Sequence, residues 1–438
     1  MNTAVIIGGG IGGLFTGAFL AKKGFKVTVL EKNETPGGGL QCFTRRGKIF
    51  ETGMHVMGGF EKGGTLERIC RYLGIMERLK IHHINSECID EIIYQQTGEH
   101  FLIPSGKENF IKKMTEYFPH EAKGVREYVE KIYELSREVP LFYLQPAQEG
   151  INVHSDMFMW PADKLIAHFV SDSRLQEILA YLNPLYGGVE GHTPAYIHAL
   201  INVHYINGTS RFEGGSQQLV DALTDIIHAA GGSVVTSAEV TRVDVMDRKV
   251  QWVETADGAR FSAEWYVSAV HPTVLIDCLP PGCFPKAFTN RMKTIPTTVS
   301  AFTLFIDLKP DTFRYIDHTC YYIDHYGAIW TNRQTSASDW PKGFMFMTPP
   351  DTNPGEYATR LLIHAVMDYE QVKEWEHTKI GRRGKEYEIW KNDKVEKILL
   401  KAEKAMPGLR NCIAHVYAAS PLTIRDYFKV YCSRPTRG

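Results

Sequence analysis

Three glycines near the amino terminus stand at a spacing that leaves backbone N–H groups free to bind an anion. Gly8, Gly10 and Gly13 form a G-x-G-x-x-G pattern directly after the apolar run at 4–7. The first glycine permits a tight turn, the second lets the backbone approach a pyrophosphate, and the third lets a helix pack close to a strand. The pyrophosphate would lie at the helix N-terminus, where unpaired N–H groups favour negative charge.

An acidic residue follows at the position expected of a ribose-binding group. The apolar run at 26–30 is typical of a second strand, and Glu31 comes eighteen residues after Gly13. A carboxylate there accepts hydrogen bonds from ribose hydroxyls and repels a 2′-phosphate, which disfavours NADP. Strand, helix, strand and acid together predict a dinucleotide site. The pattern alone leaves NAD and FAD open, and a glycine-rich turn that binds nothing is the remaining alternative.

A second glycine cluster favours the flavin dinucleotide. Gly37, Gly38 and Gly39 follow shortly after Glu31, and the stretch GKIFETGMH adds Gly53. FAD needs a second segment of close approach, because its isoalloxazine ring reaches far beyond the pyrophosphate.

Motifs along nearly the whole chain support this choice. They are PGG at 36–38, FETGMHVMG at 50–58, NPLYGGVEGHTP at 183–194, SRFEGGSQQLVDAL at 210–223, the helical stretch at 387–409 and ASPLTIRDY at 419–427. Together they resemble the phytoene desaturase, carotenoid isomerase and all-trans-retinol 13,14-reductase family of FAD-dependent oxidoreductases. The resemblance implies FAD as cofactor, a long apolar polyene or lipid as substrate, and reactions that insert, remove or isomerise C=C bonds.

The resemblance also implies the cofactor contacts. The expected residues are Gly8, Gly10, Ile11, Gly12, Gly13, Glu31, Lys32, Gly38, Gly39, Leu40, Gly53, Met54, His55 and Val240. Val240 stands where the family places backbone groups against adenine, and a plain core valine is the equal alternative. Gly39 stands where flavin amine oxidases and many desaturases carry arginine or another side chain, which leaves only backbone contact to the cofactor at that position.

His55 is the candidate catalytic residue. It matches the histidine of the family's F-D-x-G-x-H motif, in a loop expected to run along the flavin. An imidazole can move a proton while the flavin moves a hydride. A histidine that only shapes the cavity is the more common alternative. Tyr186, in the LYGG stretch, has the same choice between lining the cavity and ordinary packing.

The expected fold is α/β: a discontinuous, Rossmann-like FAD-binding domain of the glutathione-reductase type with an α+β substrate domain. The FAD-binding domain is expected at 1–85, 207–275 and 412–438, and the substrate domain at 86–206 and 276–411. Periodic apolar residues predict helices around 66–73, 125–135 and 219–227. Alternation at 302–308 predicts a half-buried strand.

The last residues depart from the family. The chain reads DYFKVYCSRPTRG, without the Gly-Asp and second glycine-rich helix start that close the flavin site in relatives. We therefore expect an incomplete C-terminal part of the FAD-binding domain and weak flavin binding. Two alternatives stay open: a flavin amine oxidase, which shares the N-terminal cradle, and a paralogue without flavin that is not an enzyme.

Composition sets broader limits. The 438 residues are 44% hydrophobic with a net charge of −1, which gives no footprint for nucleic acid. Eight cysteines without a CxxC pair and scattered histidines show no metal-ligand spacing. We expect a cytoplasmic protein without a spanning helix. The aromatic and methionine-rich stretches at 138–146 and 157–170 are more typical of core than of a tunnel or a peripheral membrane contact. The sequence leaves the oligomeric state open.

Overall fold

The amino-terminal glycines directly follow the strand at 3–7, which belongs to a four-stranded parallel sheet. The structure is a computed structural model that describes residues 2–53, 55–146, 154–296, 298–331, 338–352 and 355–429. The strand order is β10-β2-β1-β14, with β1 Thr3–Ile7, β2 Lys26–Leu30, β10 Ser233–Val235 and β14 Trp265–Ser268. Segments separated by some two hundred residues thus build one sheet, as a discontinuous Rossmann-like domain requires.

Each face of this sheet has its own cover, because successive strand side chains point to opposite faces. Ile6, Val27 and Val29 pack against helices α1 (Ile11–Lys22) and α8 (Gln217–Ala229). Val5, Ile7 and Leu30 pack against a small antiparallel sheet of β11 (Val240–Met246), β12 (Lys249–Thr255) and β13 (Arg260–Phe261). The predicted α/β class is confirmed.

A seven-stranded mixed sheet forms the second layer of the molecule. Its order is β19-β15-β18-β17-β16-β7-β8, and β7 and β16 pair in parallel. The bounds are β7 Asp90–Tyr94, β8 Glu99–Ile103, β15 Ser300–Leu308, β16 Thr319–Ile323, β17 Gly343–Met347, β18 Arg360–Met367 and β19 Ile413–Ala419.

The strand predicted at 302–308 is confirmed as β15, but it is buried along both faces, so the predicted half-burial is wrong. Phe302, Leu304 and Ile306 pack under helix α12 (Lys385–Ala405). On the other face Phe305 meets the hairpin of β3 (Cys42–Arg45) and β4 (Lys48–Glu51). Alternation in the sequence could not show this second cover, because its residues come from a distant part of the chain.

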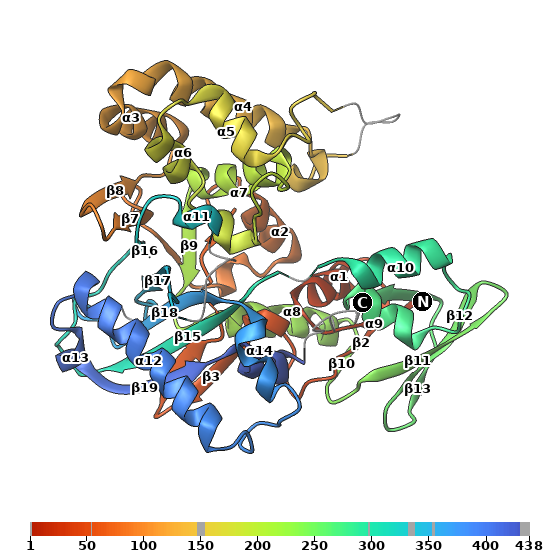
Figure 1. The fold of residues 1–438 in the computed structure, drawn as a ribbon. Coiled ribbons are helices and arrows are strands. Elements are labelled where there is room, and N and C mark those ends of the chain that lie inside the picture. Colours follow the sequence, from red (N-terminus) through yellow and green to blue (C-terminus); the bar gives the residue numbers. More distant parts are fainter. Residues whose placement is uncertain are drawn as a thin grey trace.

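Helices gather at the top of Figure 1, above the seven-stranded sheet. Their shared core includes Val125, Ile132, Ala199 and Val203. The bounds are α3 Lys107–Tyr117, α4 Ala122–Arg137, α5 Ala162–Phe169, α6 Ser173–Leu179 and α7 Ala195–Asn207. None of the helices within the described residues combines the length and apolarity needed to cross a membrane.

Smaller elements join the two layers. One is a three-stranded sheet of order β5-β9-β6, and helix α2 follows β5 in the chain. The bounds are β5 Met57–Gly58, α2 Thr65–Leu73, β6 Ile81–His83, β9 Thr209–Phe212, α9 Pro272–Cys278 and α14 Pro421–Phe428. Strand β19, which the sequence assigns to the FAD-binding domain, pairs with β15 of the large sheet. The domain boundaries stay a prediction.

Candidate cofactor site

A cavity of about 290 Å³ lies at the carboxyl ends of β1 and β2, beside the first glycine cluster. Six of the residues predicted from the sequence line it: Gly8, Gly10, Glu31, Lys32, Gly38 and Val240. Ligands of open α/β sheets bind at this end of the strands. The position of the cavity therefore agrees with the predicted dinucleotide site.

The two glycine clusters lie against each other at the mouth of this cavity. Gly37 N–H donates to the Gly9 carbonyl at 2.8 Å, and Gly37 forms a bridge to Gly10. A Cβ at Gly13 would lie 2.0 Å from the Gly8 oxygen, so the helix needs glycine there. A Cβ at Gly10 would meet no described atom within 4 Å. The second glycine thus leaves open the space that a pyrophosphate would fill.

Glu31 is buried beneath the glycine loop, with an exposed fraction of 5%. One carboxylate oxygen accepts from Gly9 N–H at 2.7 Å and the other from Asn33 N–H at 2.8 Å. Each carboxylate oxygen has about two lone-pair sites, so each keeps one for a ligand hydroxyl. The donor set of this cavity, backbone N–H groups beside a carboxylate, fits the ADP part of a dinucleotide.

The His55 ring is hydrogen-bonded to the second glycine cluster. Its Nε2 donates to the Gly39 carbonyl at 2.9 Å, and its Nδ1 lies 3.0 Å from both Glu51 Oε1 and Ser216 Oγ. Ser216 in turn donates its N–H to Glu51 and its hydroxyl to the Leu40 carbonyl. Both imidazole nitrogens therefore have fixed partners, which sets the ring orientation.

Two of these partners were not predicted as site residues. Glu51 and Ser216 lie within the FETGMHVMG and SRFEGGSQQLVDAL motifs, but nothing in either motif alone shows that they meet. Glu51 and Ser216 are 165 residues apart in the chain, and they meet because α8 packs against the second glycine cluster. Glu51 is buried, and its carboxylate organises the histidine and the start of α8 at once.

The other predicted residues occupy different places around the two clusters. Ile11, Gly12 and Gly13 open α1, and Leu40 ends the short 3₁₀ turn that begins at Gly38. Gly53 lies beside the His55 ring, where a Cβ would come within 3.2 Å of Nε2. Met54 lies outside the described residues. Tyr186 packs against the helical core, and its hydroxyl oxygen lies 3.1 Å from His198 Nδ1.

Several cavity residues escaped the sequence analysis. Ala269 and His271 follow β14. Phe428 is the last residue of α14, and Lys429 follows it. Lys32 and Lys429 hold these segments together, since each ammonium group donates to the other residue's carbonyl. Among these positions the sequence indicates only Ala269, at the end of an apolar strand on the expected pyrophosphate side, where a plain strand terminus is the favoured interpretation.

The comparisons with known proteins identify the family. Residues 11–379 match the family described as flavin containing amine oxidoreductase. The chain belongs to this family. Among curated proteins it resembles all-trans-retinol 13,14-reductase of Macaca fascicularis, 28% identical over 97% of this chain and 75% of the relative. It also resembles prolycopene isomerase of Arabidopsis thaliana, 25% identical over 97% and 72%.

Two solved structures share its fold. Putrescine oxidase bound to putrescine matches with a TM-score of 0.60 at 15% identity, over 96% of this chain and 84% of that one. A fatty acid isomerase from P. acnes matches with a TM-score of 0.58 at 14% identity, over 97% and 88%. The predicted family, the FAD cofactor and the assignment as an FAD-dependent oxidoreductase are confirmed by these matches. When bound, FAD supplies the redox chemistry.

Proposed function

We propose that this enzyme acts on C=C or C–C bonds of a hydrophobic polyene or lipid, as a desaturase, saturase or isomerase. The observation that carries the proposal is the match to relatives over 97% of the chain, whose names describe reduction of retinol and isomerisation of prolycopene. The ADP part of FAD would bind in the cavity beside Gly10 and Glu31. The flavin ring would extend along the second glycine cluster toward His55.

The residues around His55 support a role in proton transfer. Its imidazole has a carboxylate and a hydroxyl at Nδ1 and a backbone carbonyl at Nε2. A proton at either nitrogen therefore has an acceptor, and Glu51 compensates the charge of a doubly protonated ring. By exchanging its bond to the Gly39 carbonyl for one to the substrate, the imidazole could release a proton from Nε2 while Glu51 holds the ring at Nδ1. Bound FAD would supply the hydride chemistry.

The test uses the purified chain loaded with FAD. Protein loaded with FAD that has been reduced by dithionite is incubated anaerobically, and protein loaded with oxidised FAD is incubated in air so that oxygen can reoxidise the flavin. Each is given all-trans-retinol, a cis-carotenoid and putrescine in separate reactions. A product changed by two hydrogens indicates reduction or desaturation, and an isomer of unchanged mass indicates isomerisation. Turnover of putrescine alone would replace the proposal with amine oxidation. A flavin spectrum without turnover of any polyene or extracted lipid would contradict it.

We further propose that the enzyme takes its substrate from a membrane surface. Leu141, Leu144 and Met159 are 77%, 39% and 65% exposed. Glu138 joins their two segments by accepting hydrogen bonds from the N–H and hydroxyl of Ser155. These exposed side chains differ from the predicted core packing of both stretches. Exposed apolar side chains on two segments that are joined in this way favour contact with acyl chains.

Co-sedimentation with phosphatidylcholine vesicles tests this contact. The double variant Leu141→Ser with Met159→Ser should bind vesicles less than the wild-type chain, because it presents less apolar surface. The control Ile389→Ser removes an equally exposed apolar side chain, 70% exposed, from helix α12. Equal sedimentation of both variants and wild type would contradict membrane contact at this place while leaving the reaction itself unaffected.

A further inference from the structure

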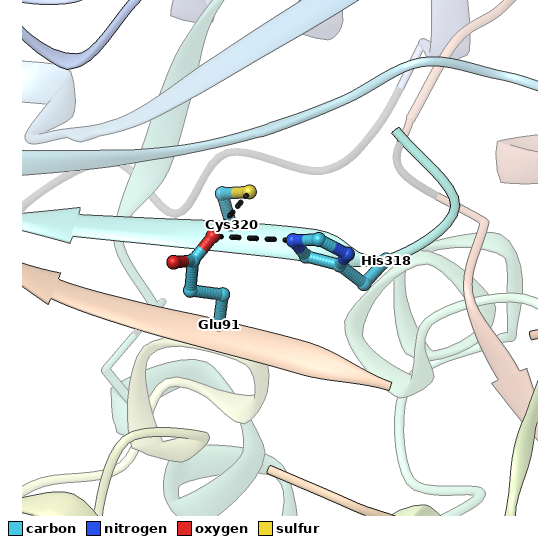
Figure 2. Close-up of side chains that lie close together, drawn as sticks. All are labelled: Glu91, His318 and Cys320. Atoms are coloured by element: carbon cyan, nitrogen blue, oxygen red, sulfur yellow. Dashed lines mark hydrogen bonds and ion pairs between the residues drawn. The ribbon is translucent and has the colours of Figure 1, made fainter. Parts of the chain in front are cut away.

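A cluster of three different donor side chains lies in the seven-stranded sheet, away from the candidate cofactor site. Glu91 on β7 is paired in register with Cys320 on β16, and His318 precedes β16 by one residue. Figure 2 shows the three side chains pointing toward one another across the two strands. One ligand atom from each lies within 4.8 Å of the others. The sequence showed no ligand spacing here, since parallel pairing brings the residues together.

The two distances from Glu91 are close to the edges of a tetrahedral metal site. Glu91 Oε2 lies 3.2 Å from His318 Nε2 and 3.7 Å from Cys320 Sγ. Zinc bonds of about 2.0 Å to oxygen and nitrogen and about 2.3 Å to sulfur give tetrahedral edges of roughly 3.3 Å and 3.5 Å. Both distances from Glu91 are within a few tenths of an ångström of these edges. The ligand atoms of His318 and Cys320 lie within 4.8 Å of each other, so an ion would have to draw the imidazole and the thiol together.

The carboxylate at the centre of the cluster is held in place from its other side. His100 on β8 lies with Nδ1 2.8 Å from Glu91 Oε1. Metal-ligating carboxylates are commonly fixed by an outer hydrogen bond of this kind. The Cys320 side chain is buried, whereas those of Glu91 and His318 are 18% and 24% exposed. The cluster thus combines a buried thiol with an opening to solvent through which an ion can enter.

We propose that Glu91, His318 and Cys320 bind a Zn²⁺ ion. Thiolate and imidazole donors favour zinc over magnesium or calcium, which prefer oxygen ligands. A thiolate and a carboxylate together balance the two positive charges, so the half-buried site becomes neutral when it is filled. The thiol gives up its proton to solvent as its sulfur bonds to zinc. Water completes the fourth position, and His100 keeps its outer bond to Glu91.

The alternative is a hydrogen-bonded cluster that binds no metal. In that case both imidazoles donate to Glu91, and these bonds lower the pKa of its carboxyl to about 2. Burial and the nearby carboxylate raise the pKa of the Cys320 thiol, which argues against a reactive nucleophile. The ion would join β7 to β16 over a separation of 229 residues. A filled site should therefore stabilise the seven-stranded sheet.

The test measures Zn²⁺ binding by the full chain, stripped with chelator and dialysed into metal-free buffer. Titration calorimetry and elemental analysis should find one zinc per chain. Cys320→Ser and His318→Gln should each weaken binding by about tenfold or more, through loss of one ligand. Cys412→Ser, which removes a half-buried thiol elsewhere in the molecule, should bind like wild type.

Two further readouts separate a lost ligand from a damaged fold. Replacing zinc with Co²⁺ should give a thiolate-to-cobalt charge-transfer band in wild type, and Cys320→Ser should lack it. Zinc should raise the melting temperature of wild type and of Cys412→Ser, because it binds only the folded state, and should leave both ligand variants unchanged. Wild type that binds no more zinc than Cys320→Ser would overturn the proposal. His318→Gln, at the half-exposed rim, keeps the test valid should Cys320→Ser fold poorly.

Discussion

At the scale of single residues, two glycines of one motif have separable tasks. Gly13 is required by the fold, since a Cβ there would lie 2.0 Å from the Gly8 oxygen. Gly10 has an ordinary φ of −68° and open space where a side chain would stand. Only the ligand, and not the protein, therefore needs glycine at this second position.

We expect Gly10→Ala to fold like wild type but to bind FAD about tenfold or more weakly, a cost of about 1.4 kcal/mol. The added methyl group would occupy the space meant for the pyrophosphate. Gly13→Ala should instead lower the melting temperature of the flavin-free protein. Flavin titration and thermal denaturation of both variants check this pair. Full FAD affinity in Gly10→Ala would place the pyrophosphate elsewhere.

His55 gives the second prediction at this scale. We expect His55→Gln to keep its flavin spectrum and to lose about 10²–10⁴ in turnover, the range typical of a general acid or base. Ser216→Ala removes one Nδ1 partner but leaves Glu51 in place, so its loss should be smaller. Steady-state kinetics with the same polyene compare the three proteins. Unchanged turnover in His55→Gln would show that this histidine only shapes the cavity and transfers no proton.

At the scale of elements, the β3–β4 hairpin fastens the second glycine cluster to the large sheet. Phe50 on β4 is fully buried and makes edge contacts with Phe305 and Tyr417. Phe50→Ala should cost about 3–5 kcal/mol of unfolding free energy, the usual price of an aromatic cavity. Ile49→Ala, one residue away and 42% exposed, is the control and should change it little. Urea denaturation measures both, and equal values would contradict the anchoring role.

Helices α4 and α7 meet at a buried histidine. His198 on α7 is fully buried, with Nε2 2.7 Å from the Tyr128 hydroxyl of α4. Burial lowers the pKa of His198 to about 4. The unfolded chain therefore takes up a proton between pH 6.5 and about 4 that the folded chain does not, so stability contributed by this residue is lost as the pH falls through that range.

The loss amounts to on the order of 3 kcal/mol across this pH range. We expect His198→Gln to show a shallower fall in melting temperature between pH 6.5 and 4 than wild type. His192→Gln, which replaces an exposed histidine, should keep the wild-type slope. Calorimetry over this pH range checks the difference. If melting temperature falls with pH equally in all three proteins, His198 takes up its proton at the same pH in the folded and the unfolded chain.

Elements with a local cause were predictable from the sequence. The strand at 26–30 has the predicted bounds, and the helices around 66–73, 125–135 and 219–227 are confirmed as α2, α4 and α8. Their periodicity and flanking glycines are local signals. Burial of β15 on both faces and the pairing of β19 with β15 depend on distant partners. The apolar periodicity of one segment cannot show which distant segment packs against it or pairs with it.

The same distinction holds for the site. The glycines and Glu31 follow from spacing, because one strand-helix-strand unit fixes their geometry. Ser216 reaches His55 across 161 residues, and Lys429 reaches Lys32 across 397. Such contacts come from the assembled fold and leave no spacing rule in the chain.

At the scale of the whole molecule, the cofactor cavity joins parts of the chain that are far apart in sequence. Its lining comes from the two glycine clusters, the start of β11, the segment leading into α9 and the end of α14. A ligand that binds this cavity contacts all of these segments at once. Binding therefore links the stability of the four-stranded sheet to that of the carboxyl-terminal helix.

We expect FAD to raise the unfolding free energy by about 2.7 kcal/mol at a hundredfold excess over its dissociation constant. Hydrogen exchange should slow on addition of FAD at 8–13, at 238–240, at 269–278 and at 428–429 together, because one ligand bridges them. Gly10→Ala, measured at the same FAD concentration, should show smaller protection at all four segments. Protection restricted to 8–13 would show that the last segment of α14 takes no part in holding the cofactor.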